Sequence, residues 1–250
     1  MVEFLIQALE HLGGLGLLVI DTVRQGLRRP REWRAWIEQL HHLGVGSAPI
    51  VLTTSLFTGM VLALQTAASW VAFGKFLIGD VVALSIVREL GPVLSALMIG
   101  GRVGAGITAE IGSMRVTEQV DAIRALAADP VKKLVFPKVL ATLVMLPVLT
   151  ILANFVGIMG GLLIACTELQ QTSDFYMKHV RAALEVHDIF SGIGKTVFFA
   201  LFISIIACYN GLRATGGADG VGRATTQTVV AASISVLVSD FFLTKLFLIL

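Results

Sequence analysis

Two charged residues lie inside a long apolar run, where their side chains could bind a polar group or pair across a helix interface. Arg88 and Glu89 precede Pro92, whose missing N–H leaves the Arg88 carbonyl without its usual helical partner. Charges in a membrane are costly and usually face a cavity or an opposite charge. Neighbouring residues on a helix point about 100° apart, so these two need not pair with each other. The pattern predicts either a polar floor or gate of a substrate cavity or a structural ion pair between helices.

Motifs that would supply covalent chemistry are absent from the sequence. It contains no G-x-S-x-G elbow, no H-E-x-x-H motif and no Cys/His cluster with zinc spacing. Residues 217–224 have the glycine spacing of a P-loop but lack the Lys and the following Ser or Thr. Adjacent His41 and His42 favour a solvated interfacial role over a metal site. An enzyme that uses Glu89 as its acid–base group would lack a nucleophile or metal. We therefore expect no catalytic residue, nucleotide site, metal or cofactor in this chain.

The composition is that of an integral membrane protein. Of the 250 residues, 56% are hydrophobic and 14% are charged, where a soluble domain carries roughly 25% charged residues. The mean hydropathy is +0.85 and the net charge is only +2, which argues against a disordered chain or a nucleic-acid binder. Cys166 and Cys208 both lie in apolar runs and are expected to be small membrane hydrophobes.

Five stretches are long enough to cross the hydrocarbon layer, which takes about 20 apolar residues in a helix. They are residues 49–73, 81–109, 139–166, 189–212 and 226–250. Their apolar character on every face excludes the alternating strands of a barrel. The third stretch must tilt, kink near Pro147 or project beyond the lipid. The predicted fold class is an all-α integral membrane protein with about five transmembrane helices.

The basic residues of the loops predict the orientation of these helices. Twelve Lys and Arg lie before the first span and in the loops after the second and fourth spans, whereas five lie on the other side. The side richer in Lys and Arg is expected to be cytoplasmic. The N-terminus is then cytoplasmic and the C-terminus periplasmic.

Residues 1–27 place apolar side chains on one helical stripe that acidic residues interrupt. This pattern predicts an amphipathic helix in the membrane interface that ends before Pro30, although a sixth, irregular span stays open. Trp33 and Trp36 beside Arg31 and Arg34 suit an anchor at the headgroups. We expect residues 1–45 to form this interfacial region and residues 46–250 to form the transmembrane domain.

Two patterns within the spans predict close contacts. Leu62, Gln65, Ser69 and Phe73 share one helical face, which suits either an amphiphile with acyl tails or an ordinary helix contact. Small-residue steps at Gly100/Gly104 and Gly157/Gly161 allow helix backbones to approach closely. Such steps pack helices within one subunit or form the seam of a homodimer.

A short amphipathic helix is predicted on the cytoplasmic side between the second and third spans. It covers residues 114–128 and ends at Asp129-Pro130. An apolar stripe is flanked by polar residues that include Arg115, Glu118, Gln119, Asp121 and Arg124. Because its acids would disfavour anionic lipid, docking against a protein partner fits better.

Residues 88–97 (RELGPVLSAL), 101–123 (GRVGAGITAEIGSMRVTEQVDAI) and 216–226 (GGADGVGRATT) resemble the MlaE family. Its members are permease subunits of ABC transporters that work with MCE-domain proteins. The resemblance covers about residues 40–250.

The resemblance implies a homodimer in the bacterial inner membrane. Two cytoplasmic ATPase subunits would dock on the helix over residues 114–128, with Glu118 and Asp121 at the acidic positions of its motif. An MCE-protein ring would lie on the periplasmic side, with phospholipid in a cavity between the permeases. The implied cavity residues are Leu62, Gln65, Ser69, Trp70 and Phe73, with Arg88 and Glu89 below them.

The function expected from the resemblance is phospholipid transport between the inner membrane and a periplasmic MCE conduit. ATP and Mg²⁺ would bind the partner ATPase, and nucleotide-driven closure would move the docked helix. The alternative is a passive membrane anchor that only scaffolds the MCE ring.

Overall fold

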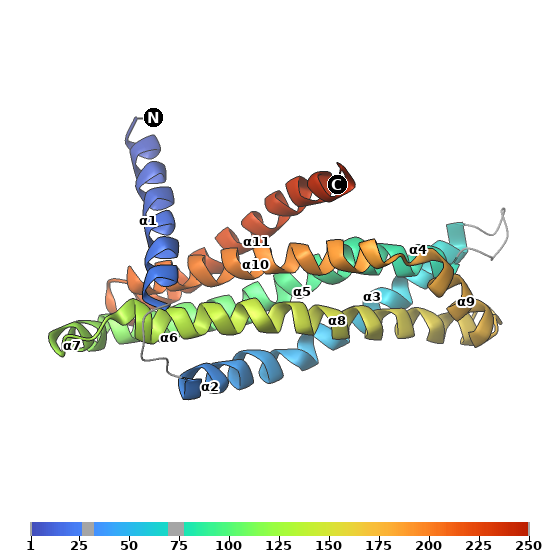
Figure 1. The fold of residues 1–250 in the computed structure, drawn as a ribbon, viewed down its shortest axis with the longest axis horizontal. Helices are drawn as coiled ribbons and strands as arrows, with labels where there is room; N and C mark the ends of the chain where they lie inside the picture. The colour runs from blue at the N-terminus through green and yellow to red at the C-terminus, as the bar shows by residue number, and fades with distance from the viewer. Residues whose placement is uncertain (1, 27–32, 70–77, 250) are drawn as a thin grey trace. The chain divides into compact units, whose positions relative to one another are not determined.

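The computed structural model describes residues 2–26, 33–69 and 78–249, and every regular element in these ranges is a helix (Figure 1). The continuous apolar runs explain this outcome, since in lipid a helix satisfies its own backbone N–H and C=O groups. The first two elements are α1 (Val2–Gly26) and α2 (Trp33–Gly44). The chain is an all-α integral membrane protein, as predicted.

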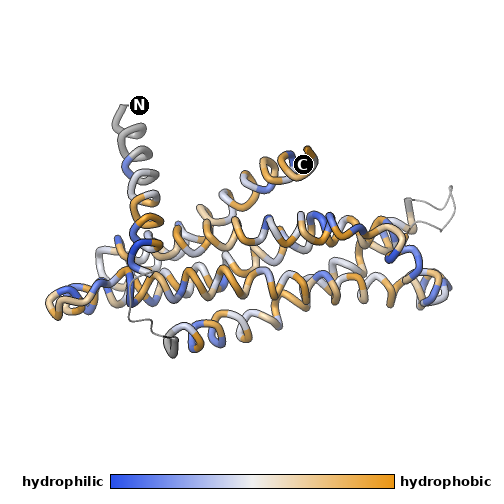
Figure 2. Tube along the Cα trace, viewed as in Figure 1, coloured by the Kyte–Doolittle hydropathy of each residue, from blue (hydrophilic) through white to orange (hydrophobic). Residues whose placement is uncertain are grey.

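Five helical segments are long and apolar enough to cross a membrane. They are Trp36–Ala68, Ile78–Val116, Val131–Thr167, Val186–Leu212 and Gly217–Phe247. Each corresponds to a predicted span and is longer than predicted, because the helices continue past the apolar run toward the headgroups. Hydrophobic residues run along the long helices, and hydrophilic ones gather largely where helices end (Figure 2).

The spans are built from consecutive helical elements. The first joins α2 through η1 (Val45–Ser47) to α3 (Ala48–Ser69), so part of the predicted interfacial region belongs to this span. The second span comprises α4 (Ile78–Ser85), η3 (Ile86–Leu90), α5 (Gly91–Ile99), η4 (Gly100–Gly104) and α6 (Ala105–Val116). The third comprises η5 (Val131–Val135) and α8 (Phe136–Thr167). The fourth is α10 (Val186–Leu212), and the fifth lies in α11 (Gly217–Ile249). Helix α8 continues through Pro147, so at 37 residues and about 1.5 Å per residue the third span projects beyond the hydrocarbon.

Two compact units share the chain. Unit 1 comprises Met1–Gly44, Gly100–Val144 and Ala200–Val236, and unit 2 comprises Val45–Ile99, Met145–Phe199 and Leu237–Leu250. The boundaries between the units fall within the five spans, so each span contributes residues to both units.

In unit 1, α1 packs against the start of the third span. A Cβ at Gly26 would overlap the Phe136 ring, and a Cβ at Gly14 would meet the Tyr209 ring. Leu17, Ile20 and Val23 leave more than half of their surface exposed, as a helix lying against lipid requires. Helix α1 is not among the five segments apolar enough to span the membrane.

In unit 2, a helix that the sequence interpretation missed covers the start of the second span. Helix α9 (Ser173–Ala183) lies beside α4 (Figure 1). Its Tyr176 is fully buried, and its hydroxyl donates to the Ile158 carbonyl oxygen at 3.3 Å. Burial raises the pKa of the Tyr176 phenol, which keeps this donor protonated.

The predicted glycine steps pack helices within the units. A Cβ at Gly157 would meet Ser55 of α3, and one at Gly161 would meet the Tyr176 hydroxyl. Gly100 and Gly104 lie against Ile203 of α10 in unit 1, at ordinary contact distances. The close-packing interpretation is therefore confirmed for Gly157/Gly161, whereas the Gly100/Gly104 step makes an ordinary helix contact that has room for a Cβ.

Candidate functional site

An open groove of about 400 Å³ runs along α3 in unit 2. Its walls are Thr54, Phe57, Thr58, Val61, Leu62, Gln65 and Leu90. The hydroxyls of Thr54 and Thr58 donate to the carbonyl oxygens of Ile50 and Thr54, one turn back, at 2.8 Å each. Because those hydroxyls are satisfied by their own helix, the groove is mainly hydrocarbon, with Gln65 as a polar end.

The groove contains two of the predicted cavity residues, Leu62 and Gln65, which lie three positions apart on α3. Ser69 ends α3, but its side chain, Trp70 and Phe73 lie outside the described residues. Whether these three line the same groove stays a prediction.

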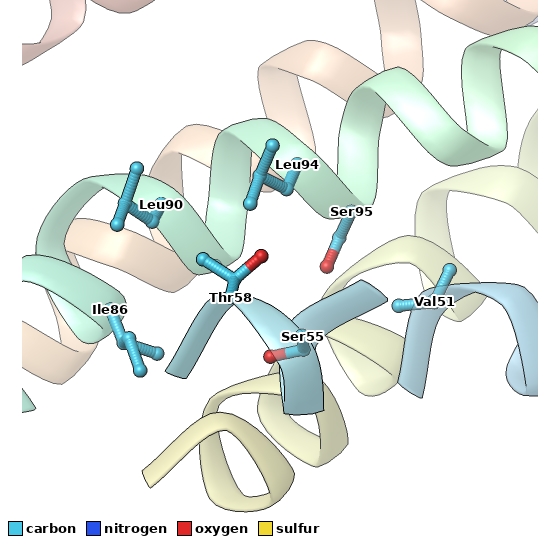
Figure 3. A pocket seen from close by; sticks show the side chains of 8 residues that line it. Val51, Ser55, Thr58, Ile86, Leu90, Leu94 and Ser95 are labelled. Atoms are coloured by element: carbon cyan, nitrogen blue, oxygen red, sulfur yellow. The ribbon is translucent and has the colours of Figure 1, made fainter. Parts of the chain in front are cut away.

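Beside the groove, the contact between α3 and the second span is closed. Ser55 and Thr58 from α3 face Leu94 and Ser95 from α5 around a cavity of about 10 Å³ (Figure 3). The Ser55 hydroxyl donates to the Ala153 carbonyl oxygen of α8 at 2.5 Å, which fixes α3 against two neighbours. A cavity of this size holds no lipid group, so the larger groove is the part of this face able to hold an acyl chain.

The second site in unit 2 is a charged cluster made of Arg88, Glu89, Asp188, Lys195 and Asp240. Arg88 Nε donates to Asp188 Oδ1 at 2.7 Å. The Glu185 backbone N–H donates to the other Asp188 oxygen at 3.1 Å, so this nearly buried carboxylate is held from two sides. The ion pair joins the second span to the start of α10.

Lys195 is the centre of the cluster, and its side chain is only 1% exposed. Its Nζ donates to Glu89 Oε1 and to Thr244 Oγ1, both at 2.7 Å, and lies 3.4 Å from Asp240 Oδ1. The Thr244 hydroxyl donates in turn to Glu89 Oε1 at 3.2 Å. The second and fifth spans thus supply the partners of one buried ammonium on the fourth span.

The backbone of the second span changes shape where it meets Lys195. Over η3 the helix widens to a π-helix, in which the Gly91 N–H donates to the Ile86 carbonyl oxygen five residues back. Lys195 Nζ donates at 3.1 Å to the Arg88 carbonyl oxygen, which Pro92 cannot reach with an N–H. The carbonyl that the sequence predicts to be free is therefore satisfied by a charged side chain.

Arg88 and Glu89 do not line the α3 groove. They line a separate pocket of about 170 Å³ together with His187, Ser191 and Phe247, among others. The ion-pair interpretation of these two residues is confirmed, whereas their contact with lipid stays a prediction. Sequence reasoning did not place Asp188, Lys195 or Asp240 in the site, although single charges within apolar runs were the signal that could have found them.

The predicted coupling helix is shorter than expected and is separated from the second span by a turn. Residues 114–116 complete α6, and the separate helix α7 covers only Gln119–Ala125. The prediction of one helix over 114–128 is wrong because Glu118 and Ala127 adopt left-handed φ angles of 61° and 58°, which interrupt the helix. Asp129 Oδ1 accepts the Val131 N–H at 2.8 Å, so Asp129-Pro130 begins the next helix and does not terminate α7.

The polar residues of this turn form a small network in unit 1. Asp121 accepts from Arg115 Nη1 at 2.5 Å and from Arg124 Nη1 at 3.3 Å. Glu118 and Gln119 are exposed, and Leu126 leaves 82% of its surface exposed beside them. The arrangement presents one large apolar side chain and one acid on a braced turn, which is a geometry suited to docking in a protein groove.

Among the described residues, no group of three or more His, Cys, Asp and Glu side chains could hold a metal ion. Cys166 is partly buried and Cys208 is buried, each as a free thiol.

A family model described as Permease MlaE matches residues 36–246. A probable ABC transporter permease protein of Rickettsia bellii is 44% identical over 246 residues, which cover 97% of this chain and 94% of the relative. The intermembrane phospholipid transport system permease protein MlaE of Haemophilus influenzae is 37% identical over 237 residues, covering 94% and 91%. The chloroplastic protein TRIGALACTOSYLDIACYLGLYCEROL 1 of Arabidopsis thaliana is 35% identical over 237 residues, covering 94% and 68%.

Proposed function

The chain belongs to the MlaE permease family, and on that premise we propose that it is the permease subunit of an ABC transporter for phospholipid. The lipid moves between the inner membrane and a periplasmic conduit of MCE-domain proteins. The chain itself forms no covalent bond, and ATP is hydrolysed on a partner subunit that holds ATP and Mg²⁺.

The observation that carries this proposal is the open hydrocarbon groove along α3. Its volume of about 400 Å³, its satisfied threonines and its single carboxamide suit an acyl chain with a polar group at one end. An enzyme would need an activated nucleophile beside the groove, whereas the Thr54 and Thr58 hydroxyls donate to carbonyls of their own helix and no titratable side chain among the described residues lines the groove to act as their base. A lipid can therefore bind there and leave unchanged.

The driving force enters through the α6–α7 turn. Leu126 and Glu118 are exposed on a turn braced by the Arg115–Asp121–Arg124 network. A partner ATPase that takes up Leu126 in an apolar groove can pull on the second span, because α6 continues that span without a break. The excess of basic residues supports a cytoplasmic turn, a cytoplasmic N-terminus and a periplasmic C-terminus.

Two permease chains form a homodimer in this proposal, and lipid occupies the space between them. Exposed apolar residues of α3, such as Phe57 and Val61, provide surface for the lipid and for the second copy. The MCE proteins cover the periplasmic ends of the spans.

The proposal is tested by filling the groove. Val61 lines it and Leu64 does not, yet both lie on α3 with 48% and 44% of their surfaces exposed. We expect Val61→Trp to lower the phospholipid that stays bound to the purified transporter complex by several-fold, and Leu64→Trp to leave it unchanged. Native mass spectrometry of the complex counts the lipids.

Equal lipid retention by the two variants and the parent would exclude the groove as the substrate path. A complex that hydrolyses ATP without retaining or moving phospholipid would instead support the scaffold alternative.

A further inference from the structure

The glycine run that resembles a P-loop builds a tight turn between α10 and α11 in unit 1. Gly216 and Gly217 adopt φ angles of +88° and +67°, which favour glycine strongly. A Cβ at Gly220 would overlap the Thr215 carbonyl oxygen, so the first turn of α11 folds closely onto the chain that precedes it. The run therefore shapes the backbone between two spans.

This turn encloses a polar pocket of about 240 Å³. Its polar lining residues are Asn210, Arg213, Thr215, Arg223 and Gln227. No carboxylate is among the lining residues, and Asp219, the acid in the first turn of α11, does not line the pocket. The pocket thus offers two positive charges and two carboxamides.

Both arginines are exposed, and neither forms an ion pair with any residue in the described ranges. Arg213 Nη1 donates to the Tyr209 hydroxyl, and its guanidinium carbon lies 5.2 Å from the centre of the Tyr209 ring. Tyr209 therefore orients the Arg213 side chain without neutralising its charge. Arg223 makes no contact of this kind with the described residues and is the freer of the two charges.

The floor of the pocket is rigid. Asn210 Nδ2 donates to Thr228 Oγ1 at 2.9 Å, and Thr108 Oγ1 donates to the same oxygen at 2.9 Å. Both threonines are fully buried. The Asn210 carboxamide is thus fixed in place before any ligand arrives.

The pocket lies where the fourth span ends at Leu212 and the fifth begins at Gly217, and the ends of membrane-spanning helices are where lipid headgroups are expected. Guanidinium groups match phosphate oxygens, and basic pockets between membrane helices bind anionic headgroups. Carboxamides suit the hydroxyls of a glycerol headgroup. The geometry points to a binding site for an anionic glycerophospholipid, with its phosphate on Arg213 and Arg223 and its headgroup hydroxyls toward Asn210 and Gln227.

This site is separate from the α3 groove and does not rest on the groove carrying substrate. The pocket of about 240 Å³ is larger than a single carboxylate, which favours a lipid headgroup over an acidic side chain of a partner protein as its occupant. Free phosphate shares the recognised chemistry, so the experiment must distinguish lipid from free anion.

The test compares phosphatidylglycerol with phosphatidylcholine of the same acyl chains. Native mass spectrometry of the full-length chain in detergent measures the binding of each lipid with and without excess inorganic phosphate. We expect a preference for phosphatidylglycerol that persists in phosphate and falls about fivefold in Arg223→Gln, the contribution of about one basic residue. Arg181→Gln removes another exposed arginine, on α9, and should leave the preference unchanged.

The inference is overturned if Arg223→Gln keeps the full preference, or if inorganic phosphate alone abolishes it. It is also overturned if Arg223→Gln releases the partner ATPase while the lipid preference stays, because the pocket would then hold a carboxylate of that partner. Val61→Trp should leave this preference intact, so failure of the groove and failure of this site are separable.

Discussion

Lys195 shows how one residue can hold three spans together inside a membrane. Its ammonium is buried against Glu89, Asp240 and the Thr244 hydroxyl. Removing one partner of a buried ion pair leaves the other charge buried without compensation, which strongly destabilises a protein. Replacing both partners by neutral residues usually changes the stability much less. We therefore expect a substitution of one charged residue of the cluster to lower the stability more than a substitution that neutralises both members of a pair.

We expect Lys195→Met to destabilise the protein by about 3 kcal/mol and to abolish transport, because Glu89 and Asp240 would lose their cation. Thermal unfolding of the purified protein in detergent measures the first effect. The double variant Lys195→Met with Glu89→Gln should recover part of the stability. If the double variant is no more stable than the single one, the two residues are not energetically coupled and the cluster interpretation fails.

At the residue scale, the sequence indicated one half of this cluster. Arg88, Glu89 and the carbonyl freed by Pro92 could be recognised because charge and a helix breaker coincide within five residues. Their partners Asp188, Lys195 and Asp240 are about 100 residues or more away along the chain. Which of several lone charges meet is decided by helix packing, and a single sequence contains no information on that packing.

At the scale of elements, the spans were predictable and their irregularities were not. Continuous apolar runs are sufficient to predict five crossing helices. Helix α9 escaped prediction because its 11 residues are too few to cross a membrane and mix charged side chains with apolar ones, of which Tyr176 and Val180 are buried. The interruption at Glu118 escaped it too, since a glutamate with a left-handed φ has no local signal.

The short α7 element permits a sharp test of coupling. We expect Leu126→Asp to reduce co-purification of the partner ATPase at least tenfold, because a charge would replace the most exposed apolar side chain of the turn. Membrane insertion should be unaffected, since Leu126 packs little within the chain. Pull-down from solubilised membranes measures the effect.

Thr226→Asp is the matched control, since it adds the same charge to an exposed position of α11 and should retain the ATPase. Full retention of the ATPase by Leu126→Asp would remove α7 from the docking surface.

At the scale of the whole molecule, the groove proposed to bind lipid, the charged cluster and the turn proposed to dock the ATPase lie on helices of one chain. The groove and the cluster belong to unit 2, whereas the docking turn belongs to unit 1. The second span contributes to both units through one helical segment, Ile78–Val116. In the proposed mechanism, a force on the α6–α7 turn is transmitted along this helical segment to the groove of unit 2.

The most direct test of the central claim is the transfer of a fluorescent phospholipid between proteoliposomes that contain the permease with its ATPase and a soluble MCE acceptor. The account predicts transfer that rises several-fold on addition of ATP and returns to the background rate when the ATPase cannot bind nucleotide. Steady ATP hydrolysis by the assembled complex with no lipid transfer above background would contradict it.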